Sequence, residues 1–183
     1  IMIIRLAKER RPPALQQRRR LLAVLAEAQH LIGLGRFPGL LQINLVGAET
    51  MAAINEASLG HQGATDVLTY DWREPNQPAT TANRHNDDDD TNDNGRDNGD
   101  GDDDDDPPIA AEIYVCPDIA CIVGPTYGNH PSREMILYAV HGMLHLADYD
   151  DLEPKSQQRM RAAENKIMTA LQKKFILTDF LKL

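Results

Sequence analysis

The hydrophobic positions along the chain follow two different periods, which predicts a mixture of strands and helices. Four short runs have the length and the branched aliphatic composition of strands: residues 1–4, 40–46, 66–70 and 110–115. Apolar residues at helical spacing occupy five further segments: residues 21–32, residues 48–57, a short segment from Pro117, residues 133–145 and a long segment from Pro154. This order predicts the α+β class, with a small sheet packed against helices.

Individual residues mark where the helices begin and end. Gly33 is expected to end the helix at residues 21–32. Ser132 is expected to cap the helix at residues 133–145. Residues 124–131 are expected to form the loop before that cap. Pro117 and Pro154 can each occupy the first turn of a helix.

Residues 74–108 interrupt the hydrophobic pattern. Within them, residues 87–106 are almost entirely Asp, Asn and Gly and include no apolar residue. Such a tract cannot bury enough surface to offset its loss of conformational entropy. We therefore expect a disordered, low-complexity insertion within one domain that spans residues 1–183. A tolerated surface insertion, an autoinhibitory mimic of RNA and a solubilising segment would all have this composition.

The insertion also accounts for the acidity of the chain. Residues 87–106 hold twelve Asp and one Arg, a net charge of −11, whereas the whole chain carries −9. The remainder therefore carries +2, and an anionic partner such as RNA is compatible with it.

The apolar runs and the cysteines indicate where in the cell the protein is expected to be located. No run approaches the roughly eighteen apolar residues of a membrane span, and the apolar run at residues 1–4 is too short for a signal peptide. We therefore expect a cytoplasmic protein that does not associate with a membrane. Cys116 and Cys121 fit neither a disulfide framework nor a zinc ribbon and are expected to be reduced thiols.

Two histidines in the fourth predicted helix have the spacing of metal ligands. His141 and His145 lie one turn apart on the same helical face, where both rings can bind one ion at about 2.0–2.1 Å. Asp151 follows after turn-forming residues and can reach the same ion if the chain folds back. Two histidines, a carboxylate and an open fourth position are typical of a catalytic zinc site. By spacing alone, a histidine pair without metal is an equal alternative.

The residues around this pair resemble a known family. Residues 141–151, HGMLHLADYDD, resemble the HGxLHLxGYDH signature of the YbeY family, zinc-dependent endoribonucleases of bacterial ribosomal RNA maturation. Other blocks resemble the family in the same order: Asn55 with residues 65–69, residues 112–115, and Met160 with Glu164. The resemblance implies a four-stranded mixed sheet with the zinc motif on a central, metzincin-like helix.

Three positions depart from the family pattern. Asp151 replaces the third histidine, which keeps a zinc ligand but makes the site one charge more negative. Asp148 replaces a glycine, and Asp accepts a left-handed backbone better than most residues. Leu59 replaces an arginine that would steady the scissile phosphate. His61 is a candidate substitute for that arginine, or else an ordinary loop histidine.

The resemblance implies a hydrolase that cleaves single-stranded RNA, with ribosomal RNA and ribosomal particles as its partners. One zinc ion held by His141, His145 and Asp151 would activate water or polarise a phosphoryl oxygen. The nucleophile would be that water or the 2′-hydroxyl of the RNA.

Other candidate site residues come from the strands and loops. Glu112 is a candidate base or a support for the ligands, or else an ordinary strand carboxylate. Asn55 and Asp66 are candidates for contacting the substrate, or for making turn hydrogen bonds, the role that we favour for Thr65.

Two further functions are compatible with parts of this pattern. Metzincin proteases share the HxxxHxxxxxD spacing, but they carry a glutamate general base directly after the first histidine, where this chain has Gly142. The sequence therefore argues against a protease. A non-catalytic zinc-binding factor of ribosome biogenesis is the main alternative, and Leu59 favours it.

Overall fold

The computed structural model describes residues 1–9, 13–73 and 107–182. Of the insertion expected at residues 74–108, all but the last two residues lie outside the described residues, so the expectation of disorder stays a prediction.

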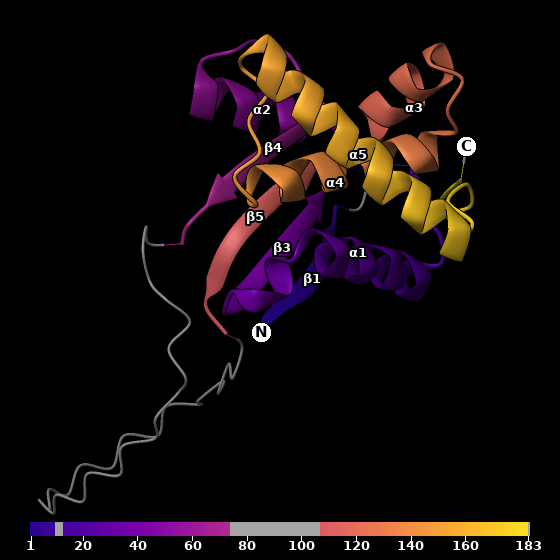
Figure 1. Ribbon diagram of the computed structural model, residues 1–183. Helices are drawn as coiled ribbons and strands as arrows, with labels where there is room; N and C mark the ends of the chain where they lie inside the picture. Colours follow the sequence, from indigo (N-terminus) through magenta and orange to yellow (C-terminus); the bar gives the residue numbers. More distant parts are fainter. Residues whose placement is uncertain (10–12, 74–106, 183) are drawn as a thin grey trace, which may run out of the picture.

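Four of the described strands form one mixed sheet. In spatial order they are β1 (Met2–Lys8), β3 (Gly39–Leu45), β5 (Ile109–Val115) and β4 (Val67–Asp71). The first three run parallel, and β4 pairs antiparallel with β5 at one edge (Figure 1). The predicted α+β class and the four-stranded mixed sheet are confirmed.

Three helices cover one face of this sheet. They are α1 (Arg18–Ile32), α4 (Pro131–His145) and α5 (Pro154–Lys174). Among them α4 is central, because it contacts β4 and β5 as well as α1 and α5 (Figure 1). Alternate residues of β5, Ala111, Ile113 and Val115, are fully buried in the core beneath these helices. Helix α4 is thus packed between the sheet and two helices at the centre of the fold.

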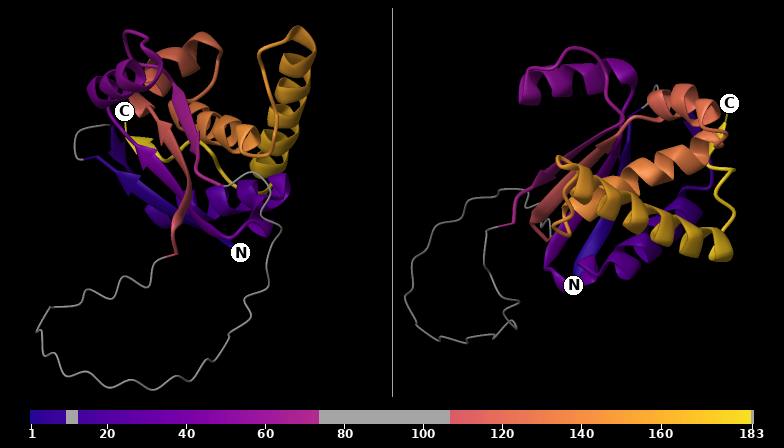
Figure 2. Two further views of the ribbon diagram at one scale, coloured as in Figure 1. Left: turned by 90° about the vertical axis from the view of Figure 1, so that its left-hand side faces the viewer. Right: turned by 45° about the horizontal axis from the view of Figure 1, so that its top comes forward.

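The other two helices lie at one end of the sheet. Helix α3 (Pro117–Thr126) leads from β5 and packs against α4. Helix α2 (Ala48–Leu59) lies on the opposite side of the sheet from α4 and α5 (Figure 2). There Met51 forms a small buried cluster with Val46 and Cys116. Among the described residues, α2 therefore covers only part of this second face.

The start of α4 differs from the prediction. Ser132 is not the cap, because His130 caps the helix and its Nδ1 accepts a hydrogen bond from the Ser132 backbone N–H at 3.1 Å. The buried Ser132 hydroxyl instead accepts hydrogen bonds from the backbone N–H groups of Phe180 at 3.2 Å and Leu181 at 3.0 Å. The preceding loop is also shorter than residues 124–131, because α3 continues through Pro125 to Thr126.

Two very short strands were not predicted. Strand β2 (Ala14–Leu15) pairs antiparallel with β6 (Leu181–Lys182) near the end of the chain. Two residues are too few to show a period, so only tertiary pairing defines them. Cys116 and Cys121 are free thiols, as expected. Within the described ranges, no helix has the length and apolarity needed to span a membrane.

Candidate metal centre

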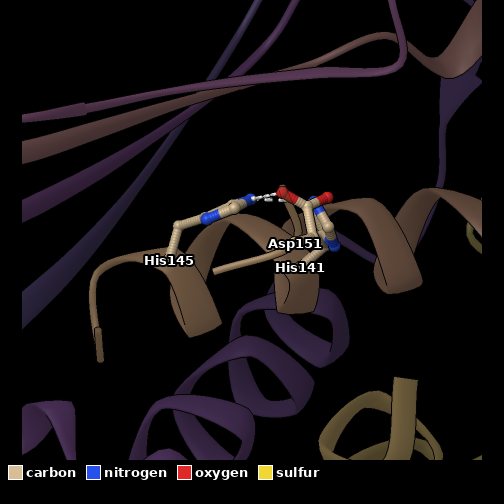
Figure 3. Close-up of side chains that lie close together, drawn as sticks. All are labelled: His141, His145 and Asp151. Carbon is tan, nitrogen blue, oxygen red and sulfur yellow. Dashed lines mark hydrogen bonds and ion pairs between the residues drawn. The ribbon is translucent and has the colours of Figure 1, made fainter. Parts of the chain in front are cut away.

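The C-terminal end of α4 brings together the three residues that were predicted as metal ligands. His141 and His145 point their Nε2 atoms toward each other, 3.0 Å apart. Asp151, in the turn after α4, places Oδ2 3.7 Å from His141 Nε2 and Oδ1 3.8 Å from His145 Nε2 (Figure 3). Two ligands bound at 2.0–2.1 Å with a tetrahedral angle would be about 3.3 Å apart. The three side chains therefore fit a single ion with only small adjustments.

A tight turn carries Asp151 back to the histidines. Asp148 has a φ of 66°, the left-handed conformation that was expected when Asp replaces glycine here. The Asp150 carboxylate then accepts hydrogen bonds from the backbone N–H groups of Asp151 at 2.8 Å and Leu152 at 3.1 Å. The position of the third ligand is thus set by local hydrogen bonds within the turn.

The second nitrogen of each histidine ring is also engaged. Glu164, on α5, lies with its Oε1 2.6 Å from His141 Nδ1, and the backbone carbonyl of Tyr149 lies 3.0 Å from His145 Nδ1. With a proton on each Nδ1, both rings donate to these oxygens and leave the Nε2 lone pairs free for a metal ion. This arrangement is typical of histidines that bind metals.

Charges around His141 stabilise its protonated form when no metal is bound. Burial alone would lower the pKa of this ring, but the hydrogen bond and the charge of Glu164 act in the opposite direction. Asp151 and Asp66 add to the effect of Glu164, and the pKa of His141 is raised above its ordinary value. A metal cation at Nε2 would benefit from the same negative charges.

Gly142 sets how closely α4 approaches the sheet. A Cβ atom at this position would lie 2.7 Å from Thr69 Oγ1 and 2.8 Å from Ile113 Cγ2. No side chain fits there without displacing the helix or the strands. The residue after the first histidine therefore faces the sheet and leaves no room for a carboxylate base.

The histidine pair is open on two sides. One pocket, which we call the metal pocket after the predicted ligands in its lining, lies between α4 and the edge strand β4. Its lining includes His141, His145, Leu59 and Tyr70. A second pocket, on the α5 side, is lined by residues that include His141, Asp151, Asp66, Glu164 and Arg161. His141 is therefore accessible from both pockets.

The edge strand is tied to the end of α4 beside the first pocket. The Arg73 guanidinium donates to the Asp71 carboxylate and to the backbone carbonyl of Leu146, and it stacks 4.3 Å from the ring centroid of Phe37. The hydrogen bond with Asp71 outweighs burial and raises the pKa of Arg73. Arg73 thus helps to set the spacing between β4 and α4.

Sequence comparison identifies the relatives of this chain. Residues 9–172 match the family described as "Endoribonuclease YbeY". The chain belongs to the YbeY family. The predicted family and the predicted class of enzyme, a ribonuclease, are confirmed.

Individual relatives agree with the family match. The chain is 30% identical over 131 residues to the Endoribonuclease YbeY of Salinibacter ruber, covering 72% of this chain and 69% of the relative. It is 29% identical over 154 residues to that of Salinispora tropica, covering 81% and 85% respectively. The solution structure of TM1509 from Thermotoga maritima shares the fold, with a TM-score of 0.56, 20% identity and coverage of 95% of this chain and 91% of that one.

Leu59, at the position where the resemblance to the family implied an arginine, contributes an apolar side chain. Leu59 ends α2 and lines the pocket between α4 and β4. His61, the candidate substitute, is exposed in the loop that follows α2, and the residues that line this pocket do not include it. The structure therefore does not bring His61 to the histidine pair.

Glu112 lies on the wrong face of the sheet for a base at the metal. Its neighbour Ile113 faces Gly142 of α4, and successive strand residues point to opposite faces. The Glu112 carboxylate instead accepts hydrogen bonds from Trp72 Nε1 at 3.3 Å and from the Tyr114 hydroxyl at 3.1 Å. The prediction of Glu112 as a catalytic candidate is corrected on this ground.

The two candidates for substrate contact have different surroundings. Asn55 is buried, and its side-chain amide donates to the Gly63 carbonyl at 2.9 Å, which fastens the loop after α2. Asp66 lines the pocket on the α5 side, and its Oδ1 accepts hydrogen bonds from the Thr65 hydroxyl and the Val67 backbone N–H, both at 2.9 Å. The structure thus brings Asp66 toward the metal ligands and gives Asn55 a structural contact.

Glu164 was not predicted as a site residue, although it was part of the family resemblance. It lies on α5 between the buried residues Met160 and Ile167, close to the buried stripe of that helix. A carboxylate in such a position needs a polar partner. The need for a polar partner, together with the two histidines elsewhere in the chain, could have indicated that Glu164 contacts one of these histidines.

Proposed function

We propose that this YbeY family member is a zinc-dependent endoribonuclease that cleaves single-stranded RNA during ribosomal RNA maturation in the cytoplasm. The observation that carries the proposal is the convergence of His141, His145 and Asp151 at the junction of two open pockets. RNA is the substrate class of the family, and we propose ribosomal RNA and ribosomal particles as the partners of this chain.

The donor atoms support zinc as the ion. Two imidazole nitrogens and a carboxylate oxygen, with an open position, match catalytic zinc sites. The same donor types also serve non-haem Fe(II), so metal analysis must measure both elements. The Glu164 carboxylate and the Tyr149 carbonyl hold the two rings in the orientation that binding requires.

The proposed chemistry divides between the ion and the chain. When bound, zinc lowers the pKa of coordinated water toward ~7 or polarises a phosphoryl oxygen. Asp151 fixes the third ligand position, and Asp66, held by Thr65 and Val67, faces the pocket where substrate or water approaches. The chemical groups at the ends of the cleaved RNA identify the nucleophile. Attack by the 2′-hydroxyl leaves a 2′,3′-cyclic phosphate, whereas attack by water does not.

Metal content and cleavage test the proposal together. We expect one zinc per chain by mass spectrometry, and we expect zinc binding and RNA cleavage both to be lost in His141→Ala and strongly weakened in Asp151→Ala. His30→Ala is the matched control, because this histidine is exposed on α1. Equal cleavage by the wild type and His141→Ala would show a contaminating nuclease and reject the proposal.

A non-catalytic zinc-binding factor of ribosome biogenesis is the second candidate. Leu59 favours it, because an apolar side chain in the metal pocket offers a phosphate no positive charge. Stoichiometric zinc without any metal-dependent cleavage would support this alternative. A protease is disfavoured by the geometry as well as by the sequence, since Gly142 lies against Thr69 and Ile113.

A further inference from the structure

Three aromatic side chains form a surface on the sheet face opposite α4. Tyr70 and Trp72 lie two residues apart along β4 and its end, with ring centroids 5.7 Å apart and planes within 4° of parallel. Tyr114 of β5 meets Tyr70 edge to face, with centroids 5.8 Å apart. We call these three residues the aromatic surface. The Trp72 side chain is large and apolar, and yet it is 57% exposed to solvent.

Hydrogen bonds hold these rings in place. Glu112 accepts from both Trp72 and Tyr114, and the Tyr70 hydroxyl shares a hydrogen bond with the Ser58 hydroxyl of α2. Each ring therefore loses little further conformational freedom when a ligand binds. Glu112 thus orients two rings of the aromatic surface.

The aromatic surface is continuous with the metal pocket. Tyr70 lines the pocket between α4 and β4 together with His141 and His145. A strand of nucleic acid that has one phosphate at the histidines can therefore cross the edge strand β4 and reach Tyr70. The ring of Trp72, which is parallel to that of Tyr70, lies next along the path of this nucleic-acid strand.

We propose that the aromatic surface binds single-stranded RNA by stacking on its bases, next to the phosphate that is cleaved. This proposal rests on the proposed function, since it names the part of that substrate which the surface holds. Bases stack on exposed aromatic rings in sequence-tolerant single-strand recognition. The Glu112 carboxylate, which holds Trp72 and Tyr114, repels phosphates and so favours bases over the RNA backbone at this surface.

Trp72 provides a direct probe because it is the only tryptophan in the chain. We would titrate the metal-loaded chain with a single-stranded oligodeoxynucleotide, which offers the same bases without being a ribonuclease substrate. A saturable quenching of tryptophan fluorescence is expected. An abasic oligomer of equal length, which keeps the phosphates, is expected to cause no quenching. Quenching by both oligomers, or binding by anisotropy without quenching, would overturn the proposal.

Variants of Trp72 add a second test. Trp72→Leu is expected to weaken single-strand binding about tenfold and to raise the KM for RNA without changing zinc content. Trp72→Phe keeps a ring and should restore most of the binding. Ile176→Ala, at another exposed apolar residue, is the matched control.

The outcomes separate this proposal from the nuclease itself. Base-dependent quenching in a chain that cleaves no RNA would support the aromatic surface and reject the enzyme. Normal cleavage, with an unchanged KM in Trp72→Leu and no quenching in the wild type, would reject the aromatic surface alone. Quenching by an unrelated acidic protein but by no oligonucleotide would mean that the occupant is a protein.

Discussion

Two residues outside the predicted ligand set control the geometry around the histidine pair. Gly142 lets α4 lie against Thr69 and Ile113, and Glu164 fixes the ring of His141. The first acts by the absence of a side chain, and the second by a charged hydrogen bond. Their substitution should therefore affect different quantities, stability in one case and metal affinity in the other.

Gly142→Ala should destabilise the fold. In an exposed helix this change would stabilise the protein by roughly 0.5–1 kcal/mol. Here the new Cβ overlaps Thr69 and Ile113, so we expect the free energy of unfolding to fall by about 1–3 kcal/mol in denaturant titrations. Gly35→Ala is the control, since a Cβ at that position meets no atom within 4 Å. Equal effects of the two changes would contradict the packing argument.

Glu164→Ala should weaken zinc binding about 10–100-fold, because His141 loses the carboxylate that orients it. Glu164→Gln keeps an acceptor oxygen and should lose less affinity. Competition with a chelating dye measures both values. Gln172→Ala, at an exposed position on the same helix, should leave zinc affinity unchanged. No change in affinity for Glu164→Ala would mean that the ring is held by packing alone.

Among the elements, α4 connects the metal pocket to the C-terminal end of the chain. Its last two turns carry the histidines, and Ser132 in its first turn binds the backbone of Phe180 and Leu181. The short ribbon of β2 and β6 depends on this contact, because two paired residues are not stable alone.

Ser132→Ala should release the C-terminal segment. The change leaves two buried backbone N–H groups without their acceptor, so we expect a loss of about 1–3 kcal/mol in the free energy of unfolding. Amide hydrogen exchange at Phe180 and Leu181 should accelerate. Thr178→Ala removes an exposed hydroxyl nearby and should have neither effect. Unchanged exchange in Ser132→Ala would show that the ribbon is held by apolar burial.

The sequence predicted the main strands and helices because their hydrophobic periods are long enough to read. The spacing of His141, His145 and Asp151 likewise predicted the cluster that the fold brings together. Ser132 was misassigned because the sequence does not distinguish a serine that caps a helix from one whose buried hydroxyl binds a distant segment. The face of Glu112 could have been inferred, since Ile113 and Val115 alternate with it as core residues.

The distribution of charge is a property of the whole molecule. Deleting residues 87–106 would change the net charge from −9 to +2, since those residues carry −11. RNA should then associate faster at low salt, and the difference should vanish near 1 M salt, where the Debye length is about 3 Å. Stopped-flow anisotropy with labelled RNA measures this. Replacing the twelve Asp by Asn keeps the length and should have the same effect. Equal rates at low salt would exclude an electrostatic role.

The residues on either side of the insertion at residues 74–108 are paired in the sheet. Asp71 pairs with Ala111, and the backbone N–H of Trp72 donates to the Ala110 carbonyl at 3.0 Å. The free energy of closing a loop grows only with the logarithm of its length, so a connection of roughly 37 residues costs about 2 kcal/mol more than one of five. This hairpin can therefore gain or lose tens of residues over evolutionary time while β4 keeps its register beside the metal pocket.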